Sequence, residues 1–332
     1  NLHKELSLLK NKKINYLAME SSSHALAQHR LDKVKIKYAV FTNLSRDHLD
    51  YHKSMQSYFL CKGRLFKYIL DKKGKAVINV DTKYGIKIKE ICVKRNIKII
   101  TYGFSNKADW QIIKIKNFNE KNWIKLKKNK KTYNFECNFF SDFEVENLVC
   151  AIILANINGL SLRKIFKSLI KIKEPTGRMQ KVLIPNNKNK IFVDFAHTPE
   201  ALKNALMGLK KQISKGSLLL VFGCGGNRDK GKRKVMANVA EKFADKVFIT
   251  DDNPRFENAG SIRAEISKNC KNSINIGNRK KAIFKAIKLM KEEDILLIAG
   301  KGHEKVQEIR GKAIPFDDFK VVKEAIAKVS LI

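Results

Sequence analysis

The chain of 332 residues carries 68 Lys and Arg against 32 Asp and Glu, a formal net charge of +36, and 44% of its residues are hydrophobic. This length fits roughly two domains, and short apolar runs separated by turn residues exclude a disordered chain. No apolar run reaches the ~18 residues that cross a bilayer, and the start NLHKELSLLKNKK lacks the pattern of a signal peptide. A cytoplasmic protein without a membrane partner is expected.

The charge and the cysteines further restrict the class of protein. Six cysteines without a CxxC pair predict neither a disulfide framework nor a zinc cluster. A charge of +36 would ordinarily indicate nucleic acid as a partner. The lysines are, however, spread along the whole chain among Ile and Asn, which favours a solvated lysine surface and no nucleic-acid partner.

The first half of the chain alternates apolar runs with segments of helical period, which predicts a mainly parallel sheet with helices on its faces. The predicted strands are residues 16–19, 37–41, 75–80 and 98–103, and the segment SYFLCKGRLFKYIL has helical period. Between residues 110 and 140, IIKIK and IKLKK alternate apolar and polar residues, as in a small antiparallel sheet. The helical pair ENLVCAIILANI and SLRKIFKSLIKI follows, with Gly159 and Ser161 as stop and cap signals.

The segment KIKEPTGRM is the best candidate for a linker, and it divides the chain into residues 1–173 and 174–332. The second part reads as another α/β unit, with predicted strands at 191–195, 217–223, 246–250 and 294–300. The last three of these strands end in the clusters CGGNRDKGKR, DDNPR and KGHE. Because ligands of open parallel sheets lie beyond the carboxyl ends of the strands, these clusters predict a binding site. Ordinary turn chemistry is the alternative, and it explains the glycines better than the charges.

Two predicted strand ends in the first unit carry ionisable side chains. Glu20 follows strand 16–19, and His48, between two aspartates, follows strand 37–41. If the strands are neighbours, Glu20 and His48 share a cation, and the oxygen-rich surroundings favour magnesium over zinc. The alternative is that His48 and His52 only hydrogen-bond a loop.

The glycine-rich segment FGCGGNRDKGKR joins a strand to a helix through Gly223, Gly225 and Gly226. Glycines let backbone N–H groups approach an anion at a helix start, and Arg228 adds a fork for a carboxylate or phosphate. The segment matches neither the GxxxxGK[ST] loop nor the GxGxxG fingerprint, so it indicates an anion site and nothing more specific.

The turn after the next strand combines an acid, an amide, a proline and a guanidinium. Asp252, Asn253, Pro254 and Arg255 suit a ligand with both an ammonium and a carboxylate, which means an amino acid. Glu304, in the KGHE cluster, offers a place for a further ammonium. The alternative is a proline turn with an incidental arginine.

Seven segments in this order resemble motifs of the Mur ligases of peptidoglycan synthesis, specifically of the type that adds diaminopimelate. They are MESSSHALAQHR, FTNLSRDHLDYH, TGRM, DFAHTPEAL, FGCGGNRDKGKR, TDDNPR and AGKGHE. The resemblance implies part of a central ATP- and magnesium-binding domain in residues 1–173 and a complete Rossmann-like, amino-acid-binding C-terminal domain in 174–332. The chain starts at Asn1 and lacks the family's uridine-binding domain and its GTNGKTT-like phosphate loop, so we expect a truncated protein that is inactive alone.

The resemblance also implies the reaction and its place in the cell. ATP phosphorylates the D-glutamyl carboxylate of UDP-N-acetylmuramoyl-L-alanyl-D-glutamate, and the amine of meso-2,6-diaminopimelate attacks the acyl phosphate to form an amide. The expected cofactors are ATP and Mg²⁺, and the expected partners are these small molecules, on a monomer. The product serves cell wall biogenesis, and through it cell shape and division.

Individual residues take their expected roles from the same resemblance. Glu20, His48 and Lys62 correspond to catalytic and metal-site positions, with Lys62 carbamylated so that oxygens instead of an ammonium face the magnesium; the alternative for Lys62 is a solvated helix lysine. The muramoyl-substrate residues are Ser22, Gln28 and Arg30. The ATP-binding residues are Asn147, Arg178, Asp194 and His197, although Asp194 is alternatively a turn cap. The diaminopimelate-binding residues are Arg228, Asp252, Asn253, Pro254, Arg255, Gly300 and Glu304.

The chain departs from the family pattern in one place, and two rival functions are considered. The family's Gly-x-Phe-Asn pattern before Asn147 reads Ser141, Asp142, Phe143 and Glu144 here. A folylpolyglutamate synthase-like ligase shares the acyl-phosphate chemistry, but DNPR and GKGHE argue against it. A basic nucleic-acid-binding protein is the rival from another class, and salt-dependent binding of unrelated duplexes would support it.

Overall fold

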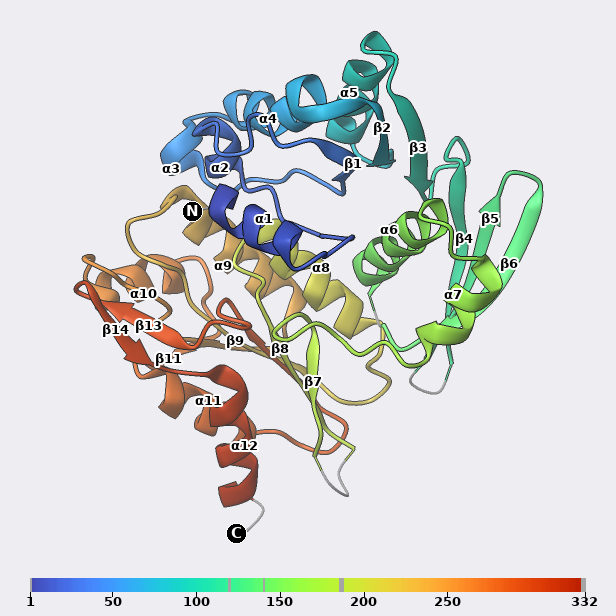
Figure 1. Ribbon diagram of the computed structural model, residues 1–332. Coiled ribbons are helices and arrows are strands. Elements are labelled where there is room, and N and C mark those ends of the chain that lie inside the picture. The colour runs from blue at the N-terminus through green and yellow to red at the C-terminus, as the bar shows by residue number, and fades with distance from the viewer. Residues whose placement is uncertain (1, 119–120, 140, 185–187, 330–332) are drawn as a thin grey trace.

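The computed structural model describes residues 2–118, 121–139, 141–184 and 188–329. These residues form two α/β lobes, an N-terminal one at the top of Figure 1 and a C-terminal one below it. Each lobe contains a six-stranded sheet, and a two-stranded hairpin adjoins the second. In the described part of the chain, no helix combines the length and apolar character needed to cross a membrane.

The N-terminal sheet joins parallel and antiparallel strands in chain order. Its strands are β1 (Ile36–Phe41), β2 (Leu70–Asn79), β3 (Lys98–Gly103), β4 (Trp110–Phe118), β5 (Lys121–Lys128) and β6 (Lys131–Cys137). The pairs from β1 to β4 are parallel, and β4 to β6 are antiparallel. The expected small antiparallel sheet is therefore an extension of the parallel one, joined where Tyr102 pairs with Trp110.

Helices cover both faces of this sheet. They are α1 (Leu2–Asn11), α2 (Ser23–Ala27), α3 (Leu49–His52), α4 (Met55–Arg64), the π-helix η1 (Leu65–Ile69), α5 (Lys83–Lys94), α6 (Asp142–Ile157) and α7 (Leu162–Leu169). Successive residues of β2 face two different hydrophobic cores. Ala76 and Ile78 pack with α4 and α5, whereas Val77 packs with α6. The period-2 geometry of a strand explains this division.

The predicted strand at residues 16–19 is wrong. The backbone of residues 14–20 follows no regular structure, and Tyr16 and Leu17 keep 75% and 55% of their surface exposed. Strand β1 is the edge of the sheet, so no strand pairs with it on that side in the described residues. Four apolar residues in a row do not specify a strand unless a neighbour supplies the ladder hydrogen bonds.

The C-terminal lobe has the predicted Rossmann-like pattern. Its strands are β7 (Gln180–Val182), β8 (Lys190–Asp194), β9 (Leu218–Phe222), β10 (Lys246–Ile249), β11 (Ser273–Asn275) and β12 (Ile295–Ala299), in the spatial order β11-β10-β9-β12-β8-β7. All neighbours are parallel except β7 and β8. The helices are α8 (Pro199–Lys210), α9 (Gly231–Phe243), α10 (Ala259–Ser267), α11 (Arg279–Lys288) and α12 (Asp318–Val329).

Every residue of β9 is buried, because helices cover both faces of this sheet. Leu218, Leu220 and Phe222 pack on the side of α8, α9 and α10, whereas Leu219 and Val221 pack on the side of α11 and α12. A continuous apolar run is typical of such a two-sided parallel strand. The hairpin β13 (Val306–Ile309) and β14 (Lys312–Pro315) follows β12 and was not predicted.

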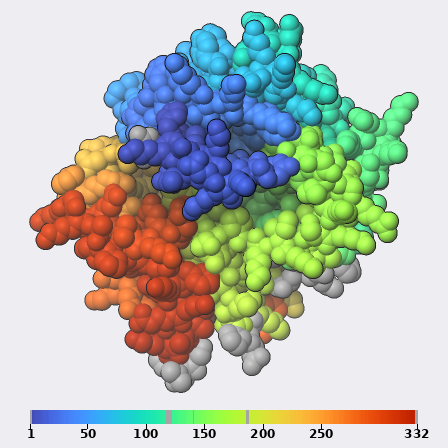
Figure 2. Space-filling model, viewed as in Figure 1, coloured from blue at the N-terminus to red at the C-terminus, as the bar shows by residue number. Residues whose placement is uncertain are grey.

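Figure 2 shows the two lobes in contact over a broad boundary, with the dark-blue N-terminal residues covering the middle of this face. All six cysteines are free and buried.

Candidate functional site

The strand order of the C-terminal sheet brings the predicted clusters to one edge. After β9, the strands β10 and β11 are added one after the other toward one edge of the sheet. The chain then returns and inserts β12 between β9 and β8, so the order of strand addition reverses between β9 and β12. The carboxyl ends of strands on both sides of such a switch point frame a ligand crevice. The loop after β1, residues 42–48, faces this edge from the N-terminal lobe, because Asp47 contacts residues of the C-terminal lobe.

Asp47 is the meeting point of the two lobes. Its Oδ2 lies 3.2 Å from His197 Nε2, and its Oδ1 lies 3.9 Å from the Nζ of the buried Lys232. Burial alone would raise the pKa of Asp47, but the hydrogen bond from His197 and the charge of Lys232 hold that pKa below its usual value. The side chain therefore stays an anion between the His197 imidazole and the Lys232 ammonium.

Two further ion pairs flank Asp47. Arg46 donates from Nε and Nη2 to the two carboxylate oxygens of Asp229, at 2.7 and 2.9 Å. Arg228 Nη1 lies 3.8 Å from Asp50 Oδ2. The loop that carries His48 is thus paired with the loop that carries Arg228.

The candidate diaminopimelate residues form one hydrogen-bonded network. Asn253 Nδ2 donates to Glu304 Oε2 at 2.9 Å. Lys301 Nζ donates to Asn253 Oδ1 and to Glu304 Oε2, both at 2.9 Å, and Lys301 is fully buried. The sequence prediction missed Lys301, although it is the first residue of the KGHE cluster. A buried ammonium needs such partners, so Lys301 fixes the amide and the carboxylate together.

Arg255 is linked to Glu304 through Glu308 and Asn253, because Glu308 N donates to Asn253 Oδ1 at 3.0 Å. Its Nη1 donates to the Gly226 carbonyl at 3.0 Å, and its Nε lies 2.7 Å from Glu308 Oε2. A Cβ on Gly226 would lie 2.0 Å from the Pro254 carbonyl oxygen. This glycine is therefore required for the close approach of two loops.

Asp252 shapes the turn and approaches the end of β12. Its Oδ1 accepts a hydrogen bond from Asn253 N at 2.6 Å. Gly300 has φ +113°, and a Cβ there would lie 2.7 Å from Asp252 Oδ2. Both the left-handed backbone and the close contact exclude other residues at Gly300.

The proposed metal residues lie around Tyr58 in the N-terminal lobe. Lys62 Nζ, on α4, donates to the Ser21 carbonyl at 3.0 Å. Burial lowers the pKa of Lys62, and the charge of Glu20 partly offsets the effect. Burial, together with nearby carboxylates that include Glu20, raises the pKa of Tyr58 to about 12. His48 stands edge-on to Tyr58, with ring centroids 6.2 Å apart.

Glu20 and His48 were expected to meet at the ends of two neighbouring strands. This prediction is wrong, because residues 16–19 form no strand. No hydrogen bond or ion pair joins Glu20 to His48 in the described structure, and Glu20 is exposed. Nor does any group of three His, Cys, Asp or Glu side chains suited to a metal ion occur among the described residues. Glu20 and His48 thus supply at most two of the proposed ligands, and the set depends on a modified Lys62.

His48 and His52 differ in their surroundings. His48 has the left-handed φ of +54°, and burial lowers its pKa against the opposing charge of Asp47. His52 is buried and stacks on Tyr58 with ring centroids 4.9 Å apart. His24 stands edge-on to His48 at 4.9 Å. His52 is therefore part of an aromatic cluster, and its Nε2 has no hydrogen-bond partner within the described chain.

The three candidate muramoyl-substrate residues lie at the two ends of α2 and in the turn after it. Ser22 caps the helix and accepts a hydrogen bond from Ala25 N at 3.1 Å. Gln28 and Arg30 are exposed. Capping of α2 is thus a structural reason for a serine at position 22.

The candidate ATP residues are spread over three elements. Asp194 is buried at the end of β8 and accepts from Met179 N at 2.7 Å and Ala196 N at 2.8 Å, so it caps its turn as the alternative proposed. Burial raises its pKa. The Arg178 guanidinium lies 4.6 Å from the centre of the Phe195 ring. Asn147 is exposed on α6.

The departure before Asn147 has a structural explanation. Ser141 and Glu144 form a capping box at the start of α6, in which Glu144 Oε2 accepts from Ser141 N at 2.9 Å. The pattern Ser-x-x-Glu is typical of a helix N-terminus.

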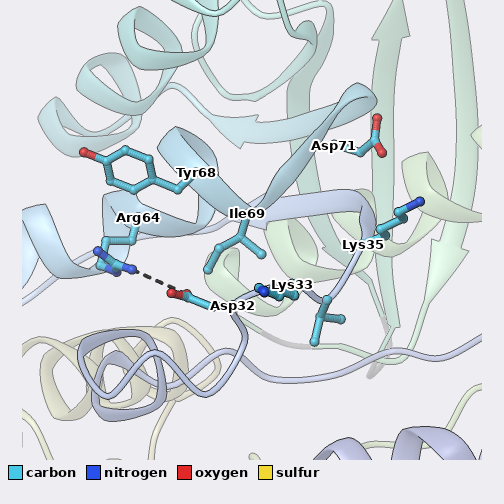
Figure 3. Close-up of a pocket in the computed structure, with 8 residues that line it drawn as sticks. Asp32, Lys33, Lys35, Arg64, Tyr68, Ile69 and Asp71 are labelled. Atoms are coloured by element: carbon cyan, nitrogen blue, oxygen red, sulfur yellow. Dashed lines mark hydrogen bonds and ion pairs between the residues drawn. The ribbon is translucent and has the colours of Figure 1, made fainter.

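A cavity of about 660 Å³ lies apart from all these residues, beside the start of β1 and η1. Figure 3 shows Arg64 turned toward Asp32, with Tyr68 above Arg64 and Lys35 at the far side of the pocket. None of the candidate site residues lines it.

Comparison with known proteins agrees with this architecture. Residues 1–155 match the Mur ligase middle domain, and residues 177–302 match the Mur ligase glutamate ligase domain. The chain belongs to the Mur ligase family.

Among curated relatives, it is similar to the UDP-N-acetylmuramoyl-L-alanyl-D-glutamate--2,6-diaminopimelate ligases of Rickettsia conorii and Anaplasma marginale. The first is 42% identical over 94% of this chain and 65% of the relative. The second is 40% identical over 99% of this chain and 68% of the relative. The chain thus spans about two thirds of the length of these relatives.

Solved structures show the same fold. A structure of a 2,6-diaminopimelate ligase of this name is 36% identical, with a TM-score of 0.59 over 93% of this chain and 64% of that one. MurF from Thermotoga maritima, solved in complex with ADP, is 15% identical, with a TM-score of 0.69 over 91% of this chain and 64% of that one. A folylpolyglutamate synthase from Mycobacterium tuberculosis is also 15% identical, with a TM-score of 0.66 over 89% of this chain and 63% of that one. The last two similarities concern the fold alone.

Proposed function

We propose that the chain provides the ATP-, magnesium- and diaminopimelate-binding parts of a cytoplasmic ligase, acting as a monomer. This ligase joins meso-2,6-diaminopimelate to UDP-N-acetylmuramoyl-L-alanyl-D-glutamate for peptidoglycan synthesis. The observation that carries the proposal is the network at the carboxyl edge of the C-terminal sheet. There Asn253 contacts Glu304, and the Arg255 guanidinium pairs with Glu308, whose backbone N–H donates to Asn253. An acid beside a guanidinium complements an amino acid that carries an additional ammonium and carboxylate.

The arrangement suits amide formation through an acyl phosphate. The acceptor carboxylate and the nucleotide phosphates are both anionic, so cations must offset their repulsion in phosphoryl transfer. Arg178 and Lys232 supply protein cations near the boundary between the lobes, and the His197 imidazole offers a further phosphate contact. Magnesium would be held by Glu20, His48 and the carbamate of Lys62, and when bound it would neutralise phosphate charge.

His197 has a second task in this proposal. Its Nε2 is held by Asp47, so a phosphate that binds this imidazole competes with the contact between the lobes. Nucleotide binding and the Asp47–His197 contact are thus linked. Asn147 is assigned to the adenine side, and Ser22, Gln28 and Arg30 to the muramoyl substrate, from the family resemblance.

Calorimetric titration of the chain with meso-diaminopimelate and L-lysine tests the proposal. We expect tighter binding of diaminopimelate, because lysine lacks the distal carboxylate that Arg255 would bind. Arg255→Ala should weaken diaminopimelate binding roughly ten- to a hundredfold, the range expected for one charged hydrogen bond, and should leave Mg-ADP binding unchanged. Arg310→Ala, an exposed arginine on the neighbouring hairpin turn, is the control.

Equal losses of diaminopimelate and ADP affinity in Arg255→Ala would contradict the assignment of Arg255. A wild-type preference for L-glutamate over both amino acids would instead indicate a folylpolyglutamate synthase-like ligase.

A further inference from the structure

We propose that Glu308 is a positioning residue that determines amino-acid specificity by orienting the Arg255 guanidinium. This inference rests on the proposed function, because it concerns how the same site recognises the distal carboxylate. Glu308 lies on β13, outside the seven segments that resemble Mur ligase motifs.

The backbone of the hairpin holds Arg255 in an unusual conformation. Arg255 has φ +52°, which is uncommon for a residue with a side chain. Arg255 N donates to the Glu308 carbonyl at 2.9 Å, and Arg310 N donates to the Arg255 carbonyl at 2.7 Å. Glu308 N also donates to Asn253 Oδ1 at 3.0 Å. The hairpin therefore extends its hydrogen bonding onto the turn that carries Arg255.

The side chain of Glu308 then determines which edge of the Arg255 guanidinium is free to bind a ligand. Its Oε2 lies 2.7 Å from Arg255 Nε, while Nη1 donates to the Gly226 carbonyl at 3.0 Å. Among the described residues, no protein acceptor binds Nη2. Because the Nε edge is occupied, a ligand carboxylate has to approach the end of the fork formed by Nη1 and Nη2. Without Glu308 the guanidinium would rotate among several directions and lose this pre-organisation.

A matched control exists in the same lobe. Glu265 forms an ion pair with Arg233 at 2.9 Å, and its side chain is 46% exposed, compared with 47% for Glu308. The side chain of Arg233 is 2% exposed, compared with 21% for Arg255, and it keeps a second carboxylate partner in Glu257 when Glu265 is removed. Only Arg255 belongs to the candidate amino-acid site.

The test compares wild type, Glu308→Ala, Glu308→Gln and Glu265→Ala by titration with meso-diaminopimelate and L-lysine. Glu308→Ala should weaken diaminopimelate binding roughly tenfold and leave lysine binding nearly unchanged, so that the preference falls. Glu308→Gln keeps an acceptor oxygen and should restore part of the preference. Glu265→Ala should behave as wild type.

Two further measurements separate the possible failures. Nitrogen-15 NMR should show that the Arg255 Nε–H signal broadens or shifts in Glu308→Ala. If the preference and this signal are both unchanged, or if both ligands weaken in step with a lower unfolding midpoint, Glu308 has no positioning role. A wild-type chain with no preference for diaminopimelate would overturn the proposed function itself, whereas a preference that survives in Glu308→Ala overturns only the present inference.

Discussion

Arg46 and Asp229 are 183 positions apart in the sequence, yet they form a two-point ion pair across the boundary between the lobes. The pair lies next to the Asp50–Arg228 contact. The two contacts join the loop after β1 and the short helix α3 to the loop between β9 and α9. The relative placement of the candidate metal and amino-acid residues therefore depends on charged contacts between these segments.

A charge exchange tests the Arg46–Asp229 pair. Arg46→Asp and Asp229→Arg should each lower the free energy of unfolding by about 1 kcal/mol, since Arg46 is 43% exposed and solvent screens the pair. The double variant should recover most of that loss. Urea unfolding measures the three values, and a double variant as unstable as the sum of the single ones would show that the pair contributes nothing.

The same pair predicts a pH dependence of stability. The hydrogen bond from Arg46 lowers the pKa of Asp229 below its ordinary value of 3.8, against the opposing effect of burial. The folded state therefore binds this proton more weakly than the unfolded state, so the contribution is complete above pH 3.8 and is lost as the pH falls through the folded-state value. The stability difference between wild type and Asp229→Asn should shrink below about pH 4. An unchanged difference at lower pH would contradict this account.

The buried pair Arg279–Asp318 supports the end of β12. Both side chains are fully buried, and Arg279 also donates to the Ala299 carbonyl at 2.9 Å, next to Gly300. Asp318→Ala should cost about 3 to 5 kcal/mol in unfolding free energy, because it leaves a buried guanidinium without its partner. Replacing both residues by Met and Leu should cost less. Lys280→Ala, which breaks an exposed pair with Glu324, is the control and should change stability by less than about 1 kcal/mol.

Lys62 should form a carbamate. Its amine is part-buried with a lowered pKa, and the neutral amine is the form that reacts with carbon dioxide. Carbon-13 NMR of the chain in labelled bicarbonate should show a carbamate signal that Lys62→Arg abolishes. A signal that persists in Lys62→Arg, or no signal in wild type, would count against the modified lysine and the metal set that needs it.

The C-terminal lobe was largely predictable because its strands are continuous apolar runs that end in polar clusters. The run of β9 is buried on both faces, and each cluster follows a strand of the same parallel sheet. Parallel strands place their carboxyl ends at one edge, so Arg228, Asn253 and Glu304 had to gather there. Local pattern and sheet geometry together were sufficient for this part.

Other features depend on tertiary contacts that no local pattern records. The pairing of Arg46 with Asp229 and the burial of Lys301 both follow from the packing of distant segments. The hairpin had a weak signal in the sequence, which is the glycine at position 311. Arg310 and Gly311 both have positive φ, as a two-residue hairpin turn of type I′ requires. Residues 16–19 show the reverse case, in which a strand-like composition found no neighbouring strand.

The attachment of the hairpin to the turn at Arg255 has a consequence for protein engineering. Two of the hydrogen bonds that hold it use only main-chain atoms, and every residue of β14 is exposed. Side chains on this ribbon can thus be varied while its frame persists and the sheet beneath stays intact. A combinatorial library confined to residues 306–315 is therefore a rational starting point for directing such a ligase toward unnatural amino acids.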